Sequence, residues 1–147
     1  MNFVGPVCPG EAHAIQSLAL RRAGISHEQI AYINAHGTGT ELNDKSETAA
    51  IHAVFGAHAS RLCVSSIKPM VGHTLSAAGA IEVAATALAL RGQFAPPTLN
   101  YETPDPDCDL DYVPNQARPL AMTYAMSNSL AFGGNNTSMI LKVADHD

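Results

Sequence analysis

Residues 30–40 read Ile30-Ala31-Tyr32-Ile33-Asn34-Ala35-His36-Gly37-Thr38-Gly39-Thr40, an apolar run that stops at a glycine-rich turn. A short apolar run bounded by a turn predicts a buried strand, here one that ends at Asn34. A second such strand is predicted over Leu62 to Ser66, and Lys68 and a turn that carries His73 follow it. Because reacting groups in α/β sheets gather beyond the carboxyl ends of strands, we expect His36, Lys68 and His73 to share one site.

Helices are predicted between and around these two strands. The predicted helices are 10–23, Asp44 to Phe55 and a segment after His73, and the predicted closing strands are Met122 to Ser127 and Ser138 to Val143. The helix after His73 is apolar nearly all round, which predicts a place between two layers. Alternation of strands and helices favours a layered α/β fold in a single domain, residues 1–147.

The segment from Gly92 to Pro119 has a different composition. It contains six of the nine prolines and the acidic run Asp105 to Asp111, so regular helix is not expected there. A short strand over Leu110 to Val113 is predicted within this surface excursion. Pro69 likewise argues against a helix immediately after Lys68.

The composition excludes several classes of protein. The chain has 147 residues, 46% of them hydrophobic, with a net charge of −5 and no Lys/Arg cluster, so a nucleic-acid surface is not expected. The apolar run Leu75 to Leu90 is shorter than the ~20 residues of a membrane span and contains Glu82, which predicts a core helix. The first residues lack the build of a signal peptide, and three cysteines are too few for a disulfide framework, so we expect a reducing cytoplasm.

His36 and His73 are the candidate reacting groups. Two neutral imidazoles delivered by glycine turns suit the binding of an oxyanion or enolate oxygen, although each could also be an ordinary partly buried loop histidine. His73 precedes a predicted helix N-terminus, which favours the neutral ring. A zinc site needs three or four close ligands, and the remaining histidines are expected to face solvent. They are His13, His27, His52, His58 and His146.

Lys68 and Glu82 form a second set of candidates. Lys68 is either an exposed loop lysine or a buried ammonium paired with Glu47 or Glu82. Glu82 lies within an apolar helix and needs a counter-charge there. Cys8 precedes a helix start, where a thiolate is favoured, but no base lies near it in sequence.

The loop between the two closing strands contains Gly133-Gly134 directly after Phe132. A tight hairpin is the simplest interpretation, and a mobile aromatic side chain at Phe132 is the functional one. The fingerprints of phosphate and dinucleotide binding are absent from the sequence, so the glycines do not indicate a phosphate site.

Four motifs in order along the chain resemble the carboxyl-terminal half of β-ketoacyl-acyl-carrier-protein synthases, the condensing enzymes of fatty acid and polyketide synthesis. The motifs are Asn34 to Thr40, Asp44-Lys45-x-Glu47, Val64 to His73 and Ser127 to Gly134. The segments Pro96 to Asn100 and Cys108 to Pro114 match the family as well. The resemblance therefore covers nearly the whole chain.

The resemblance implies one βαβαβ-type half of a thiolase-like fold, in which two halves pack as five α-β-α-β-α layers and usually form a homodimer. It implies that His36 and His73 bind the malonyl thioester carbonyl and stabilise the enolate, and that Lys68 supports them electrostatically. Phe132 would be the gate of the acyl pocket, and its N–H, beside Gly133, part of an oxyanion hole. Acyl carrier protein is the implied partner, and no organic cofactor is implied. A monovalent cation would be held by residues matching Asn34, Glu47, Glu82, Ser127 and Asn136.

The sequence also departs from the family pattern. Family members are longer, and their nucleophilic cysteine lies in an amino-terminal half that this sequence lacks; none of Cys8, Cys63 or Cys108 sits in a matching motif. We therefore expect the chain alone to be inactive, as one piece of a longer enzyme or with a partner chain that supplies the cysteine. Ala131 replaces a common glycine and Asn135 a common threonine, and the added Cβ at Ala131 should restrict the gate loop.

Two other interpretations stay open. The chain could be a non-catalytic partner of a synthase, such as a chain-length-factor-like or truncated subunit, although the intact His36, Lys68 and His73 argue against it. A thiolase or a hydroxymethylglutaryl-type synthase fits the two-histidine arrangement less well.

Overall fold

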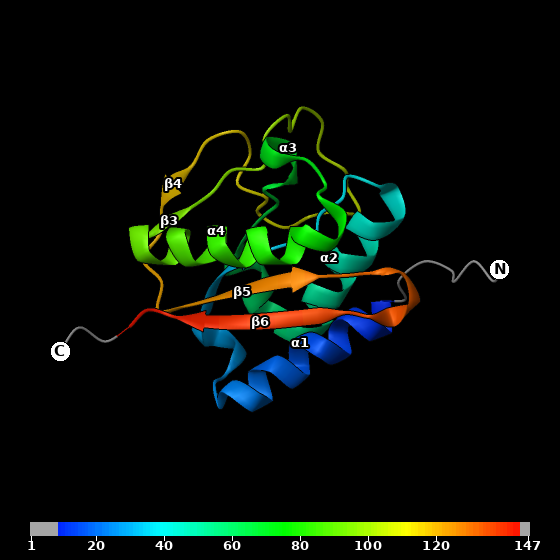
Figure 1. Ribbon diagram of the computed structural model, residues 1–147. Coiled ribbons are helices and arrows are strands. Elements are labelled where there is room, and N and C mark those ends of the chain that lie inside the picture. Colours follow the sequence, from blue (N-terminus) through cyan, green and yellow to red (C-terminus); the bar gives the residue numbers. More distant parts are fainter. Residues whose placement is uncertain (1–8, 145–147) are drawn as a thin grey trace.

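The computed structural model describes residues 9–144, which form a four-stranded sheet with helices on both faces (Figure 1). Its strands are β1 (Ile30–Asn34), β2 (Cys63–Ser65), β5 (Tyr124–Ser129) and β6 (Thr137–Lys142). Their order is β2-β1-β5-β6, with β1 parallel to β2 and β5, and β6 antiparallel to β5. Asn34 pairs with Ser65 on one side and Ser127 on the other, so the carboxyl ends of three strands lie side by side.

Within residues 9–144, four α-helices and several short 3-10 helices surround the sheet. The α-helices are α1 (Pro9–Ala23), α2 (Glu41–Phe55), α3 (Lys68–Val71) and α4 (Ala78–Gly92), and a small second sheet pairs β3 (Phe94–Ala95) with β4 (Arg118–Pro119). In Figure 1, α4 runs along one face of β5 and β6, and α1 lies on the opposite face. The described residues are thus one α-β-α unit, as expected for half of a five-layer fold.

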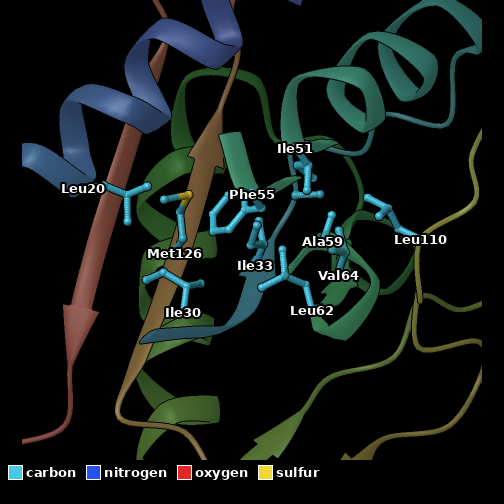
Figure 2. Close-up of a cluster of buried hydrophobic side chains, with 11 residues drawn as sticks. Leu20, Ile30, Ile33, Ile51, Phe55, Ala59, Leu62, Val64, Leu110 and Met126 are labelled. Atoms are coloured by element: carbon cyan, nitrogen blue, oxygen red, sulfur yellow. The ribbon is translucent and has the colours of Figure 1, made fainter. Parts of the chain in front are cut away.

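Alternation along β1 supplies side chains to both faces of the sheet. Ile33 packs toward α1 and α2 with Phe55 and Met126, in the cluster drawn in Figure 2. Tyr32 points to the other face and packs with Leu90 of α4 and Ala125 of β5. This period of two explains why the run is apolar throughout: both faces of β1 are covered.

α4 is covered on one side only within the described chain. Glu82, Thr86 and Ala89 are buried against the sheet, whereas Leu75 just before α4 and Leu88 within it are 76% and 64% exposed. The prediction that this helix lies between two layers is therefore confirmed for one face of α4 only. Contrary to the prediction that this run is too short, Leu75–Gly92 is the one helix of residues 9–144 that is long and apolar enough to cross a membrane by length and composition alone, although it carries the buried acid Glu82.

Several predicted element boundaries need correction. The prediction that Pro69 prevents a helix is wrong, because Pro69 lies in the first turn of α3, where its missing N–H needs no partner. α2 begins at Glu41, three residues before the predicted Asp44. The predicted strand over 110–113 is reduced to one isolated bridge, between Asp111 and Cys63. Residues 1–8, predicted to be irregular, lie outside the described range.

Candidate active site

The turn after β1 is fixed by a carboxylate from α2. Glu47 Oε1 accepts the N–H of His36 at 2.9 Å, and Glu47 Oε2 accepts the N–H of Gly37 at 3.0 Å. Glu47 is buried, and burial raises the pKa of its carboxyl group, while the two backbone N–H donors act in the opposite direction. The helix that follows the turn thus reaches back and fixes the backbone of His36.

Lys68 is a buried lysine at the start of α3. Its side chain is 6% exposed, and its ammonium donates to Glu82 Oε1 and to the His36 carbonyl. The Lys68 Nζ also lies 3.3 Å from His36 Nδ1. Of the two sequence interpretations the buried one holds, and the carboxylate partner is Glu82 rather than Glu47. Glu82 in turn receives the counter-charge that its apolar helix requires.

The rings of His36 and His73 converge. Their centroids are 5.6 Å apart and their planes are nearly perpendicular, at 85°. His36 is buried, whereas His73 is exposed at the rim, where the described chain leaves it open. The two imidazoles that the sequence places 37 positions apart therefore lie at one site, as predicted.

The hydrogen bonds of each ring determine its tautomer. His36 Nδ1 faces the Lys68 ammonium, which can only donate, so the ring proton sits on Nε2. His73 Nδ1 accepts the backbone N–H of Leu75 at 3.3 Å, which again leaves the proton on Nε2. Both rings therefore offer an Nε2–H donor, the chemistry required to bind a developing oxyanion.

His36 should stay neutral in mildly acidic solution. Burial, then the positive Lys68 and then His73 lower the pKa of His36 from 6.5 to about 4. As pH falls from 6.5 to about 4, the unfolded chain binds a proton at His36 that the folded chain does not, so folding stability decreases across this window. An NMR titration of the His36 ring should give a midpoint well below 6.5, and Lys68→Met should raise it. A midpoint near 6.5 would contradict the buried, ammonium-flanked geometry.

The loop of residues 130–136 between β5 and β6, which the resemblance implies is the gate loop, is described only in part. The backbone of Phe132–Gly134 forms a short 3-10 turn in which Gly133 has φ +84°, a conformation that favours glycine. The Phe132 side chain lies outside the described part, so its role as a gate stays a prediction. Ala131 is extended, with φ −134°, and this conformation accommodates its Cβ without strain.

The residues implied for a monovalent cation are brought together only in part. Asn34 Oδ1 and Ser127 Oγ are buried without a protein partner, and the two residues are paired in register across β1 and β5. Unpartnered buried oxygens fit a cation ligand set. Asn136 does not fit as well, because its Oδ1 accepts the N–H of Ala131 within the gate loop. Asn128, which is buried in β5, places its Nδ2 3.4 Å from Glu47 Oε1.

The remaining histidines and cysteines form no second site in residues 9–144, where no group of three His, Cys, Asp or Glu could hold a metal. His27 and His58 correct the prediction that these histidines face solvent, because both are half-buried, and His58 bonds to the Ile30 carbonyl. Cys63 is buried beside Arg118, and Cys108 is half-buried. Cys8 and His146 lie outside the described range.

A cavity of about 680 Å³ opens beside the converged turns. Its lining includes Gly37, Lys68 and His73, together with Thr98 and Tyr112 of the proline-rich segment 92–119. Sequence reasoning did not place this segment at the site, since nothing in its composition indicates what it packs against. The only signal was its match to the same family.

Comparison with known proteins identifies similar chains. Residues 2–102 match the family model described as "Beta-ketoacyl synthase, C-terminal domain". The 3-oxoacyl-[acyl-carrier-protein] synthase 2 of Coxiella burnetii is 53% identical over 123 residues, which are 84% of this chain and 30% of that enzyme.

Two solved structures have closely similar folds. One is a type II polyketide acyl-carrier protein in complex with its ketosynthase bound to the hexaketide (TM-score 0.93, 39% identity, 98% of this chain and 36% of that chain). The other is a ketosynthase in complex with its chain length factor from Xenorhabdus doucetiae (TM-score 0.82, 43% identity, 97% and 36%). The chain thus spans about a third of the length of the proteins it matches.

Proposed function

Because the chain belongs to the β-ketoacyl synthase family, we propose that it supplies the malonyl-decarboxylating part of a 3-oxoacyl-ACP synthase, an acyltransferase of fatty acid or polyketide biosynthesis. The observation that carries this proposal is the convergence of His36 and His73, with ring centroids 5.6 Å apart, beside the buried Lys68. Both rings offer an Nε2–H donor, and two such donors match the one oxygen that becomes negative in this reaction.

The reaction uses these donors in its first step. The bond between the malonyl α-carbon and its carboxylate breaks, carbon dioxide leaves, and the electron pair moves onto the thioester oxygen to give an enolate. The Nε2–H groups of His36 and His73 bind that oxygen as its charge develops. Lys68 holds the His36 ring in the donor tautomer through Nδ1. The enolate carbon then attacks an acyl thioester on a cysteine of the companion half and expels the thiolate.

The acyl thioester needs its own binding groups. The backbone N–H of Phe132 and the adjacent Gly133 would stabilise the oxyanion formed there, and Phe132 would gate the acyl pocket. The positive φ of Gly133 supports this role, since a glycine turn lets the backbone approach a substrate closely. The loop begins directly after β5, whose carboxyl end lies beside that of β1.

A cysteine-bearing half is the first partner that we propose. The outward face of α4 and the segment before it expose apolar side chains, among them Leu75, Ile81 and Leu88, which a second sheet-and-helix half would cover. Acyl carrier protein would deliver the malonyl group, docking mainly on the companion half because this chain is acidic. A homodimer of the whole synthase and a cytoplasmic location complete the proposal, and the free thiols of Cys63 and Cys108 suit a reducing compartment.

A non-catalytic subunit resembling a chain length factor is the rival function. It is favoured by the similarity to a solved complex that contains a ketosynthase together with its chain length factor. The buried contacts of Lys68 with Glu82 and His36 count against it, because a purely structural subunit has no need to bury an ammonium against a ring nitrogen.

One experiment separates the two functions. The chain is co-purified with its companion half, the native mass is measured, and release of carbon dioxide from malonyl-ACP is followed. We expect a complex containing a cysteine-bearing chain that decarboxylates and condenses. A stable complex in which replacing His36 and His73 leaves both activities intact would establish the non-catalytic role instead.

A monovalent cation would be held by Asn34, Ser127, Glu47 and Glu82. No organic cofactor would be bound. The unpartnered Asn34 Oδ1 and Ser127 Oγ support this part of the proposal. Thermal unfolding should then occur at a higher temperature in potassium chloride than in choline chloride at equal ionic strength, and Ser127→Ala should reduce the difference. Equal unfolding temperatures in the two salts would argue against a cation at this position.

A further inference from the structure

We infer that Ser66 is a positioning residue that sets the spacing between His36 and Lys68, and that Thr98 of the Pro96–Asn100 motif holds Ser66 in place. The inference rests on the proposed function, since it concerns how the same site is held. It assigns a role to a motif that the decarboxylation chemistry does not use.

The hydroxyl of Ser66 joins the two turns of the site. Ser66 Oγ donates to the carbonyl of Gly37 at 2.9 Å and accepts the backbone N–H of Lys68 at 3.2 Å. Ser66 is 6% exposed, so water competes little for either bond. One side chain therefore ties the residue after His36 to the residue that carries the ammonium.

The two turns also meet in direct contact. A Cβ built on Gly37 would lie 2.5 Å from the Cβ of Ser66, which is closer than two non-bonded carbon atoms approach. Gly37 also has φ +45°. On its other side the N–H of Gly37 is bound by Glu47. Gly37 is thus held at its N–H by Glu47 and at its carbonyl by Ser66, and Ser66 also bonds the N–H of Lys68.

Thr98 fixes Ser66 from outside the two turns. Thr98 Oγ1 accepts the N–H of Ser66 at 3.2 Å. The backbone of Thr98 is itself held, because its N–H donates to the carbonyl of Val113 and its carbonyl accepts the N–H of Asn115, both at 2.9 Å. The backbone of Thr98 is therefore fixed, and its hydroxyl holds the N–H of Ser66 in a defined position.

Loss of this support should change how Lys68 acts on His36. The charged and titratable groups around His36 are Lys68 from α3, His73 from the loop before α4, Glu47 from α2 at its backbone, and Glu82 through Lys68. Of these, Lys68 is the one whose turn Ser66 fixes. If the ammonium moves away from Nδ1, the His36 ring binds a proton more easily and loses its fixed tautomer.

The test measures decarboxylation of malonyl-ACP by the complete synthase from pH 4 to pH 9. The variants are Ser66→Ala, Thr98→Val, their combination, and Thr98→Ser, which keeps the hydroxyl. Ser60→Ala serves as the matched control, because its hydroxyl bonds the Ala57 carbonyl on the exposed surface. His36→Ala in the same assay tests the proposed function independently.

We expect Ser66→Ala and Thr98→Val each to lower kcat by about tenfold or more and to move the acid limb of the profile to higher pH. Thr98→Ser and Ser60→Ala should keep the normal profile. The combined variant should be no worse than Ser66→Ala, because residues that act through one contact are not additive.

Unchanged rates and acid limbs in Ser66→Ala and Thr98→Val, with His36→Ala inactive, would overturn the positioning role and leave the proposed function standing. Additive losses in the combined variant would overturn the link through Thr98. Should Ser66→Ala fail to fold, as judged by circular dichroism, the comparison of Thr98→Val with Thr98→Ser decides. Full activity of His36→Ala would instead refute the proposed function itself.

Discussion

Replacing His73 by alanine should lower decarboxylation of malonyl-ACP by the complete synthase about 10²–10³-fold. His73 presents its Nε2–H beside that of His36, and its Nδ1 is occupied by the N–H of Leu75. The variant removes one of two donors to the enolate oxygen, and a water molecule in its place would have to reorganise as the charge develops. Because the donor matters most when negative charge has formed, kcat should fall far more than the KM for malonyl-ACP rises.

Two comparisons make this result specific. His52→Ala removes an exposed histidine on α2 that bonds Asp109 on the surface, so it should leave the rate unchanged. Acyl transfer to the cysteine of the companion half should also survive in His73→Ala, since that step uses a different oxyanion hole. Normal decarboxylation in His73→Ala would remove the basis for assigning the two imidazoles to one oxygen.

The sequence predicted the sheet and the convergence of the site for physical reasons that can be stated. β1 is apolar on both faces and stops at a glycine turn, so its end and the residues after it could be located. Parallel strands bring their carboxyl ends to one edge, so the sequence alone predicted that His36 and Lys68 lie together. A carboxylate at Glu82 within an apolar helix likewise predicted a buried ion pair. The structure confirms this pair, and the cation is Lys68.

Other features could not be predicted, because they depend on packing between distant segments. The choice between Glu47 and Glu82 as the partner of Lys68 is decided by which helix face meets which turn, and each helix offers a carboxylate. Asn128 beside Glu47 was missed in the same way. The prediction at Pro69 was wrong for a different reason. Proline disrupts the interior of a helix but fits its first turn, and Pro69 lies in the first turn of α3.

The second large effect should follow from breaking the buried ion pair. Lys68→Met leaves the Glu82 carboxylate 2% exposed without its ammonium, and we expect the free energy of unfolding to fall by about 3–5 kcal/mol. Glu82 must then either stay charged without a partner or take up a proton, and both cost free energy. Urea unfolding of the complete synthase, followed by circular dichroism, measures the loss.

The double variant Lys68→Met with Glu82→Gln separates this cause from a simple packing defect. Removing both charges should recover most of the stability, because the loss arises from the stranded carboxylate rather than from the missing attraction. Lys45→Met is the matched control, since Lys45 contacts Glu41 and Asp107 at the surface and should change stability little. The double variant should nevertheless stay deficient in decarboxylation, because His36 Nδ1 no longer faces an ammonium. Equal instability of the single and double variants would show that Lys68 stabilises the fold through packing and not through charge.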